Sequence, residues 1–272
     1  MTSAIRLSAN PMKIAIAQIS CSLGDPEANL SKVHDFSHRA KEVGAELIVF
    51  PETTDTGYAM TVIQEHAGHW NSGFVPGLQE IAKNLSIAIV SGVSERDGSS
   101  IYNSQILVDP QGDIVARYRK THLYAVAPVE EQSCFAPGDK FASFALGDLR
   151  FGFSICYDLR FPEVYRKLVT EQKVDAFVIS SAWPFPRVEH WRVLAQARAI
   201  ENQAYTIASN RVGKDDGLWF CGSSTIIDPR GVVIAAGSAD REELIHADLS
   251  QELVFSVRGR VHSLAHRRMD LY

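Results

Sequence analysis

Residues 13–52 read "KIAIAQISCSLGDPEANLSKVHDFSHRAKEVGAELIVFPE" and begin and end in short apolar runs that are typical of buried strands. Between these runs, apolar side chains recur at helical spacing, at Leu30, Val33, Phe36 and Ala40. Gly44 follows at a position that suits the end of a helix. A strand, a helix and a strand in so short a segment predict buried sheet with a crossover connection.

The same alternation continues along the rest of the chain. We expect helices at 76–86, 160–172 and 189–203, and strands at 87–95, 151–155, 174–182 and 205–213. Two further segments, 100–120 and 223–237, each hold two strand-like runs around a D-P-x-G turn, which is a hairpin signal. No Pro/Ser/Gly-rich linker or block of charge interrupts the pattern, so it predicts one α/β domain with helices packed outside layered sheet.

Composition excludes several classes of function. The formal net charge of −5 gives no electrostatic reason to expect a nucleic acid or an anionic membrane as partner. The N-terminal residues lack the apolar stretch of a secretory signal, and the apolar runs are far shorter than the roughly 20 residues that span a bilayer. We therefore expect a cytoplasmic protein without a membrane span.

The sequence shows no pattern that requires a cofactor or a metal. Neither nucleotide-binding glycine motif is present, and the four cysteines are widely spaced without a C-x-x-C pair. The pairs His34/His38 and His262/His266 have metal-binding spacing on a helix, but no third ligand lies near either pair in sequence. Solvated helix faces are the favoured interpretation of both pairs.

Three reactive side chains stand where predicted strands end, which in α/β folds is where ligands bind. Glu52 follows the second strand, Lys120 leaves a hairpin strand, and Cys156 lies between a strand and a predicted helix. Taken singly, each has an ordinary alternative: a solvated acid, a surface lysine and a buried core thiol. Together they are the parts of an acyl-transfer site, with a nucleophile, a base and a charge-stabilising group. At a helix N-terminus, the thiol of Cys156 is expected to have a lowered pKa.

Four segments resemble the nitrilase, or carbon–nitrogen hydrolase, superfamily, in family order. They are "GAELIVFPE" (44–52), "YRKTHL" (118–123), "FGFSICYDLRFPEVYRKL" (151–168) and "QARAIENQAYTIASNRVG" (196–213). The resemblance extends over essentially the whole chain from residue 13 and is closest to the amidase branches, such as omega-amidases and deaminated-glutathione amidases. It implies a four-layer α-β-β-α sandwich, formed by one domain over 1–272 with its core at about 12–250.

The resemblance also implies roles for individual residues. Cys156 would be the nucleophile, Glu52 the general base and Lys120 the group that stabilises the oxyanion. A second glutamate, Glu131, would hold Lys120, although the neighbouring Glu130 leaves this assignment ambiguous by one position. The backbone N–H of Tyr157 would complete the oxyanion hole. Family members usually form homodimers or larger homo-oligomers, and the tail at 251–272 is expected at such an interface.

The residues around Cys156 favour a small amide as substrate. The chain has Cys-Tyr-Asp where nitrile hydrolases of the family typically have Cys-Trp-Glu, which argues against nitriles. Arg160 is a candidate for binding a substrate carboxylate, because a guanidinium grips a carboxylate through two parallel hydrogen bonds. An ion pair with Glu163 or Asp158 is an equally weighted alternative.

Trp183 and Tyr58 are further candidates for the pocket wall. Packing against the helix is an equally weighted alternative for Trp183, whereas a loop tyrosine such as Tyr58 is more often simply packed. The predicted function is an omega-amidase-like hydrolase that acts through a Cys thioester and a Glu-Lys-Cys triad. The alternatives are hydrolysis of N-carbamoyl compounds or nitriles, Cys–His catalysis with His122, and a catalytically silent binding module of the same fold.

Overall fold

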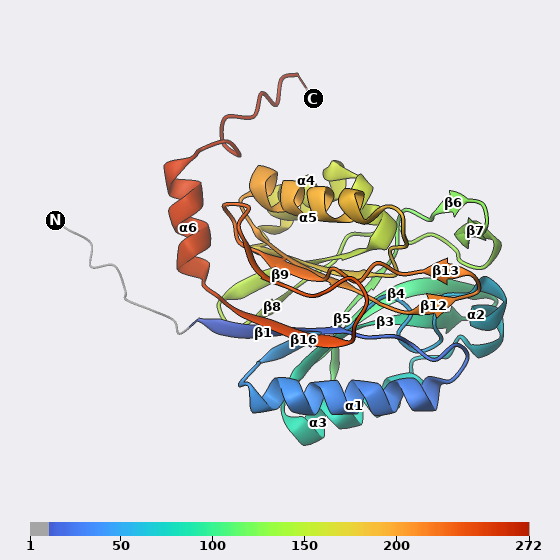
Figure 1. Cartoon of the computed structure of the whole chain (residues 1–272). Helices are drawn as coiled ribbons and strands as arrows, with labels where there is room; N and C mark the ends of the chain where they lie inside the picture. Colours follow the sequence, from blue (N-terminus) through green and yellow to red (C-terminus); the bar gives the residue numbers. More distant parts are fainter. Residues whose placement is uncertain (1–10, 272) are drawn as a thin grey trace.

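Two six-stranded sheets stack face to face in the computed structural model, which describes residues 11–271 (Figure 1). The first sheet has, in spatial order, β16 (Glu243–Leu249), β1 (Met12–Gln18), β2 (Leu47–Val49), β3 (Ala88–Asp97), β4 (Ser100–Val108) and β5 (Ile114–Arg119). The second has β15 (Val233–Ala236), β14 (Thr225–Ile227), β11 (Tyr205–Asn210), β10 (Ala176–Ser181), β9 (Leu149–Ile155) and β8 (Ser143–Leu146).

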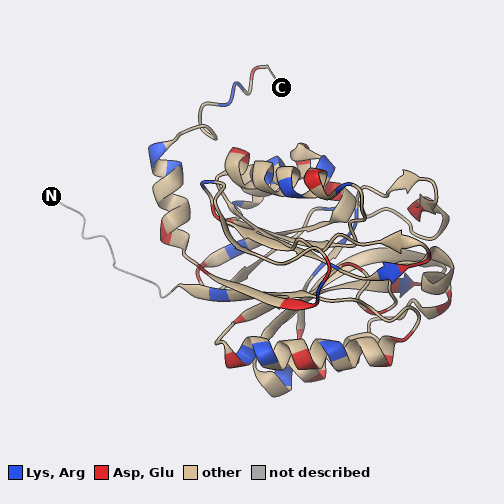
Figure 2. Ribbon diagram, in the orientation of Figure 1, with Lys and Arg blue, Asp and Glu red and all other residues tan. Residues whose placement is uncertain are grey.

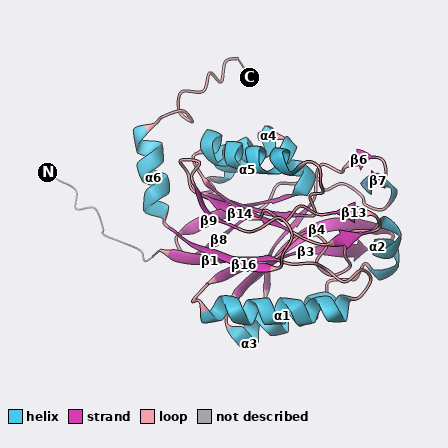
Figure 3. Ribbon diagram, viewed as in Figure 1, coloured by secondary structure: helices cyan, strands magenta, loops and turns pink. Residues whose placement is uncertain are grey.

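Helices cover the outer face of each sheet (Figures 1 and 3). The first sheet is covered by α1 (Pro26–Glu42) and α3 (Phe74–Leu85), and the second by α4 (Pro162–Gln172) and α5 (Val188–Asn202). Figure 2 shows most charged residues on the helices and loops, while the strands between them are mostly uncharged. The predicted four-layer α-β-β-α sandwich is therefore confirmed.

Short elements gather at the two ends of the sandwich (Figure 1). At one end lie α2 (Met60–His66), the hairpin of β6 (Ala125–Val126) and β7 (Val129–Glu130), and the hairpin of β12 (Lys214–Asp215) and β13 (Leu218–Trp219). At the other end lies α6 (Gln251–Arg260). The placement of residues 251–272 at an oligomer interface and the domain limits stay predictions. Among residues 11–271, no helix combines the length and the apolar character that crossing a bilayer would need.

Both sheets follow one strand plan. In each sheet three adjacent strands are parallel, β1–β2–β3 in the first and β9–β10–β11 in the second. In each sheet an antiparallel hairpin extends one side, β4–β5 in the first and β14–β15 in the second, and both D-P-x-G turns lie where the sequence predicted them. The crossover connection predicted for residues 13–52 is present, because α1 joins the parallel strands β1 and β2. The second sheet has a corresponding crossover, in which α4 joins β9 and β10.

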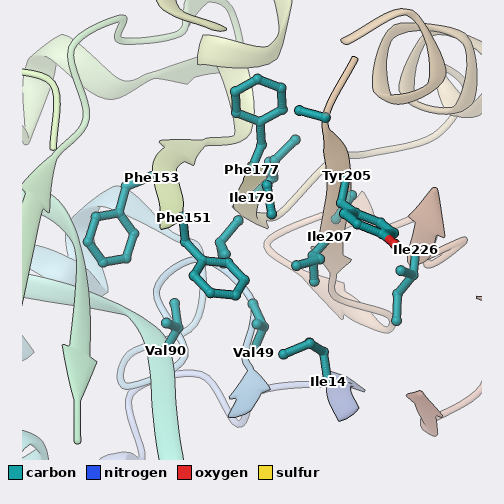
Figure 4. Packing of buried hydrophobic residues seen from close by; sticks show 14 of the residues in the cluster. Ile14, Val49, Val90, Phe151, Phe153, Phe177, Ile179, Tyr205, Ile207 and Ile226 are labelled. Carbon is teal, nitrogen blue, oxygen red and sulfur yellow. The ribbon is translucent and has the colours of Figure 1, made fainter. Parts of the chain in front are cut away.

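The core lies mainly between the sheets. Alternate residues of a strand face opposite sides, so Ile14 points into the core between the sheets whereas Ala15 packs beneath the helices of the first sheet. Figure 4 shows Ile14, Val49 and Val90 of the first sheet facing aromatic and aliphatic side chains of the second. Cys156 belongs to this core cluster, at the point where β9 ends.

Candidate active site

Lys120 lies between two carboxylates that come from different parts of the chain. Its Nζ is 2.8 Å from Oε1 of Glu52 and 2.7 Å from Oε1 of Glu131, and none of the three side chains is exposed to solvent. Burial alone would lower the pKa of Lys120, but the two carboxylates raise it well above its ordinary value. The side chain is therefore a fixed ammonium group at neutral pH.

Glu52 is held in place by groups from both sheets. Its Oε1 accepts a hydrogen bond from Asn103 Nδ2 at 2.7 Å, and its Oε2 accepts one from the backbone N–H of Ala182 at 2.8 Å. Gly92 of β3 allows this close approach, because a Cβ there would lie 2.6 Å from the Cα of Glu52 and 2.5 Å from the backbone oxygen of Pro51. The position of Glu52 thus depends on both sheets being stacked.

Glu131 rather than Glu130 contacts Lys120, which resolves the ambiguity left by the sequence. Glu131 opens the short 3₁₀ turn Glu131–Ser133 and is fully buried, whereas Glu130 is exposed. Its carboxylate accepts hydrogen bonds from Tyr58 Oη at 2.7 Å and from the backbone N–H of Tyr124 at 2.6 Å. Burial raises the pKa of Glu131 above its ordinary value although Lys120 opposes the shift.

Cys156 follows β9 directly and begins the 3₁₀ turn Cys156–Arg160. Its φ is 43°, in the left-handed region, and the residue is 7% exposed. The expectation of a lowered pKa at a helix N-terminus is wrong. The α-helix starts only at Pro162, and burial together with the negative charge of Glu52 raises the pKa of Cys156 well above its ordinary value, against the opposing effect of Lys120. The resting side chain is a thiol whose proton needs a base.

Asp158 connects this turn to the segment around Lys120. Its carboxylate accepts hydrogen bonds from the backbone N–H of Ile155 at 2.9 Å and from Tyr118 Oη at 2.7 Å, and it lies 2.9 Å from His122 Nδ1. The ring of His122 stacks on Phe161 at a centroid distance of 3.8 Å. The structure therefore pairs His122 with Asp158, so Asp158 is not the partner of Arg160. His122 is not among the residues that line the cavity at Cys156, and this absence argues against Cys–His catalysis.

A cavity of about 380 Å³, part of which opens to solvent, leads to Cys156. It is lined by Tyr58, Tyr124, Val129, Cys156, Tyr157, Arg160, Ala182, Trp183, Pro184, Arg187 and Leu218. All four residues predicted to bind substrate are in this set, and the lining includes no carboxylate. The thiol is thus buried but reachable, at the base of a pocket whose charged groups are guanidinium groups.

Comparison with known proteins gives the family. The sequence pattern described as carbon–nitrogen hydrolase matches residues 13–258. The 2-oxoglutaramate amidase of Bacillus subtilis is 34% identical over 95% of this chain and 98% of its own, and an omega-amidase of Saccharomyces cerevisiae is 30% identical over 99% and 98%. The chain belongs to the carbon–nitrogen hydrolase family.

Solved structures agree with this assignment. An amidase from Nesterenkonia sp. AN1, with acrylamide added to its active-site cysteine, is 27% identical, has a TM-score of 0.85 and covers 96% of this chain and 98% of that one. Another structure of that amidase is a complex with butyramide. The predicted membership of the nitrilase superfamily and the predicted hydrolase class are both confirmed.

The residues predicted to bind substrate make different packing contacts in this hydrolase. Arg160 forms an ion pair with neither Glu163 nor Asp158 and instead lies over the ring of Trp183, with its Cζ 4.9 Å from the centroid. Trp183 also packs against Trp191 of α5, with centroids 5.7 Å apart, so it is both pocket wall and core. The histidine pairs have ring centroids 6.5 Å apart at His34/His38 and 6.0 Å apart at His262/His266, and no three potential metal ligands converge anywhere in residues 11–271.

Three contributors to the site were missed from the sequence. Asn103 interrupts the apolar pattern of β4, and its buried amide contacts Glu52, so a polar residue at an inward position was the available signal. Tyr124 and Arg187 line the pocket from loops, where no periodicity marks a residue as functional. Their placement depends on how the hairpin β6–β7 and the segment before α5 fold back over Cys156.

Replacing Tyr58 by Phe tests the support of Glu131. The hydroxyl is buried and donates to a carboxylate, so its loss should lower the free energy of unfolding by about 1.5–3 kcal/mol and reduce turnover. Chemical denaturation and a rate assay measure the two effects. Tyr102→Phe is the matched control, because no hydrogen bond to the Tyr102 hydroxyl is found in residues 11–271, and the change there should stay within about 0.5 kcal/mol. Equal effects in the two variants would contradict the role of the Tyr58 hydroxyl.

Proposed function

We propose that this carbon–nitrogen hydrolase is an amidase that cleaves the terminal amide of a small carboxylate-bearing substrate and releases ammonia. The observation that carries the proposal is the pocket itself. Its base holds Cys156, its lining offers two guanidinium groups, and it contains no acidic side chain that would repel a carboxylate. The names of the Bacillus and yeast relatives support the same substrate class.

In the proposed mechanism, the sulfur of Cys156 attacks the amide carbon while Glu52 accepts the thiol proton. The carbonyl oxygen becomes an oxyanion, which the ammonium group of Lys120 and the backbone N–H of Tyr157 stabilise. Glu52 then gives its proton to the leaving nitrogen, the carbon–nitrogen bond breaks, and ammonia leaves a thioester on Cys156.

Water completes the cycle in a second, similar step. The oxygen of a water molecule attacks the thioester carbon while Glu52 takes a proton from that water molecule. The carbon–sulfur bond then breaks. The sulfur recovers its proton from Glu52, and the substrate leaves as a carboxylic acid. Glu131 takes no proton in this scheme. It holds Lys120 and, with Tyr58, shapes the acyl end of the site.

The raised pKa of Cys156 is consistent with a base-assisted mechanism. Burial and the negative charge of Glu52 raise the pKa of Cys156 and so favour the protonated thiol, and the proposed mechanism therefore couples proton transfer to the attack. Cys156 is only 7% exposed, and low exposure to solvent limits oxidation and other side reactions of a thiol.

An ammonia-release screen tests the proposal. It compares monoamides of small dicarboxylates, N-carbamoyl amino acids, neutral aliphatic amides and nitriles. We expect the monoamides to give the highest kcat/KM. N-carbamoyl amino acids also carry a carboxylate, so faster cleavage of these would move the assignment to carbamoyl hydrolysis, and faster cleavage of nitriles would overturn it.

Arg160→Gln makes the screen specific to carboxylate recognition. Because a charge-assisted bidentate contact is lost, kcat/KM for a dicarboxylate monoamide should fall about 10- to 100-fold, mainly through KM. The neutral amide butyramide should be cleaved at nearly the rate of the unmodified enzyme. A similar loss on both substrates would mean that Arg160 supports the pocket rather than binding a carboxylate.

A further inference from the structure

Five side chains that line the pocket are joined in a closed series of contacts, which we call the mouth ring: Arg160, Tyr157, Tyr124, Arg187 and Trp183. The Arg160 guanidinium carbon lies 6.0 Å from the Tyr157 ring, and the Tyr157 and Tyr124 rings meet edge to face with centroids 5.1 Å apart. The Arg187 guanidinium carbon lies 6.0 Å from the Tyr124 ring. Trp183 completes the ring, since it lies under Arg160 and its Nε1 donates to the backbone oxygen of Arg187 at 2.9 Å.

The two arginines of the mouth ring are linked through aromatic side chains. Tyr157 and Tyr124 lie between the two guanidinium groups, and Trp183 contacts the Arg160 guanidinium with its ring and the Arg187 backbone with its indole N–H. Both arginines line the cavity and both are half-buried. The arrangement therefore offers two separate guanidinium groups to one ligand, rather than one merged patch of charge.

The backbone of Arg187 is held by the surrounding loop. Its N–H donates to the backbone oxygen of Pro184 at 3.2 Å, and its oxygen accepts from the Trp183 indole. The adjacent Phe185 donates its N–H to the backbone oxygen of Trp219 at 2.8 Å, which ties this loop to β13. A guanidinium on a fixed backbone loses less conformational freedom when it binds a ligand.

Arg187 has no acidic partner to satisfy it. Within residues 11–271 neither Arg187 nor Arg160 forms an ion pair, whereas Arg119, Arg198, Arg211 and Arg258 each do. Arg160 has a 3.3 Å contact with His190 Nδ1, and Arg187 has only the aromatic ring beside its guanidinium. A half-buried guanidinium without a carboxylate partner is suited to an anionic or strongly polar ligand.

We infer that Arg187 is a specificity-determining residue, which binds a second oxygen acceptor at the carboxylate end of the substrate. Arg160 would hold the carboxylate, and Arg187 would hold an oxo, hydroxy or second carboxylate group on the adjacent carbon. The inference rests on the proposed function and narrows it to ω-amides that carry such a group beside the carboxylate. A lone carboxylate would engage only one of the two arginines.

The test compares two ω-amides of equal length, 2-oxoglutaramate and glutaramate, which differ only in the oxo group. In Arg187→Gln, kcat/KM for 2-oxoglutaramate should fall at least tenfold, while that for glutaramate should change less than threefold. In Arg160→Gln, both values should fall together. The 2-hydroxy analogue and an amide with a second carboxylate at the same carbon identify which acceptor Arg187 prefers.

Controls separate recognition from folding. Arg192 lies on the helix that follows Arg187 but does not line the cavity. Arg192→Gln should therefore leave kcat/KM unchanged for both ω-amides. Binding of the products 2-oxoglutarate and glutarate to the inactive Cys156→Ala protein, measured by calorimetry with and without Arg187→Gln, gives a readout independent of turnover.

Several results would overturn the inference. An equal loss of kcat/KM for the two ω-amides in Arg187→Gln would mean that Arg187 binds the carboxylate itself or supports the loop. An unchanged kcat/KM for both would mean that Arg187 does not contribute to substrate recognition. If the unmodified enzyme cleaves neither ω-amide but cleaves another class in the screen, the proposed function fails and this inference fails with it. If it cleaves both and only the Arg187 comparison fails, the proposed function stands.

Discussion

Cys156→Ser is expected to lower the rate of ammonia release roughly a thousandfold or more while the protein remains folded. A serine hydroxyl loses its proton far less readily than a thiol, so the substitution removes most of the nucleophilic reactivity of the side chain. The side chain is nearly the same size, so packing around the residue should be preserved, and serine occupies the same turn. Turnover is measured with a monoamide substrate, and folding by circular dichroism and thermal melting.

Cys156→Ala provides the reference for this experiment, because it removes the nucleophile completely. Both variants should retain binding of the product carboxylate, since Arg160 is unchanged. Undiminished hydrolysis in Cys156→Ser would reject Cys156 as nucleophile. A catalytically silent binding module would instead show no ammonia release from the unmodified protein with any substrate of the screen.

Lys120→Met is expected to abolish activity and to lower the free energy of unfolding by about 3–5 kcal/mol. The substitution leaves the two buried carboxylates of Glu52 and Glu131 without their shared cation. Methionine has a similar length and fills the space, so lost charge rather than a cavity is tested. Lys13→Met is the matched control, because the ion pair of Lys13 with Asp248 is exposed and should contribute no more than about 1 kcal/mol.

The stability loss in Lys120→Met should grow as the pH rises from about 4 to about 8. Burial and the nearby charge of Glu52 already raise the pKa of Glu131, and removing Lys120, which opposes both effects, raises it further. A carboxyl with a raised pKa binds more protons in the folded than in the unfolded state, so folding is favoured at low pH and loses that support as the pH rises. A stability difference that is the same across this range would contradict the shared-cation arrangement.

The fold was largely predictable because its signals are local. The apolar periods of 13–52 and the D-P-x-G turns depend on neighbouring residues, and the structure keeps them as strands, helices and hairpins. The juxtaposition of Glu52 and Lys120 followed from both standing at strand ends. The family resemblance supplied the expected role of Glu131. The structure shows that Glu131, rather than Glu130, is buried in contact with Lys120.

The parts that could not be predicted depend on contacts between distant segments. The direction of the pKa shift of Cys156 was wrong because burial and the charge of Glu52, contributed by the first sheet, determine it more than the local backbone does. The sequence offered Asp158 as a partner of Arg160, yet its carboxylate contacts Tyr118 of β5 and His122, which follows β5. Arg187 carries no sequence signal, because its significance comes only from the mouth ring.

The shared strand plan of the two sheets distributes the reacting groups unevenly. Glu52 and Lys120 leave the first sheet, while Cys156 leaves the second, and the hydrogen bond from the Ala182 N–H links the Glu52 side chain to the second sheet. Neither sheet alone therefore carries both the proposed nucleophile, Cys156, and the proposed base, Glu52. In the proposed mechanism, a chain emerging during synthesis is therefore expected to lack acyl chemistry until its later half has been made and has docked on the first sheet.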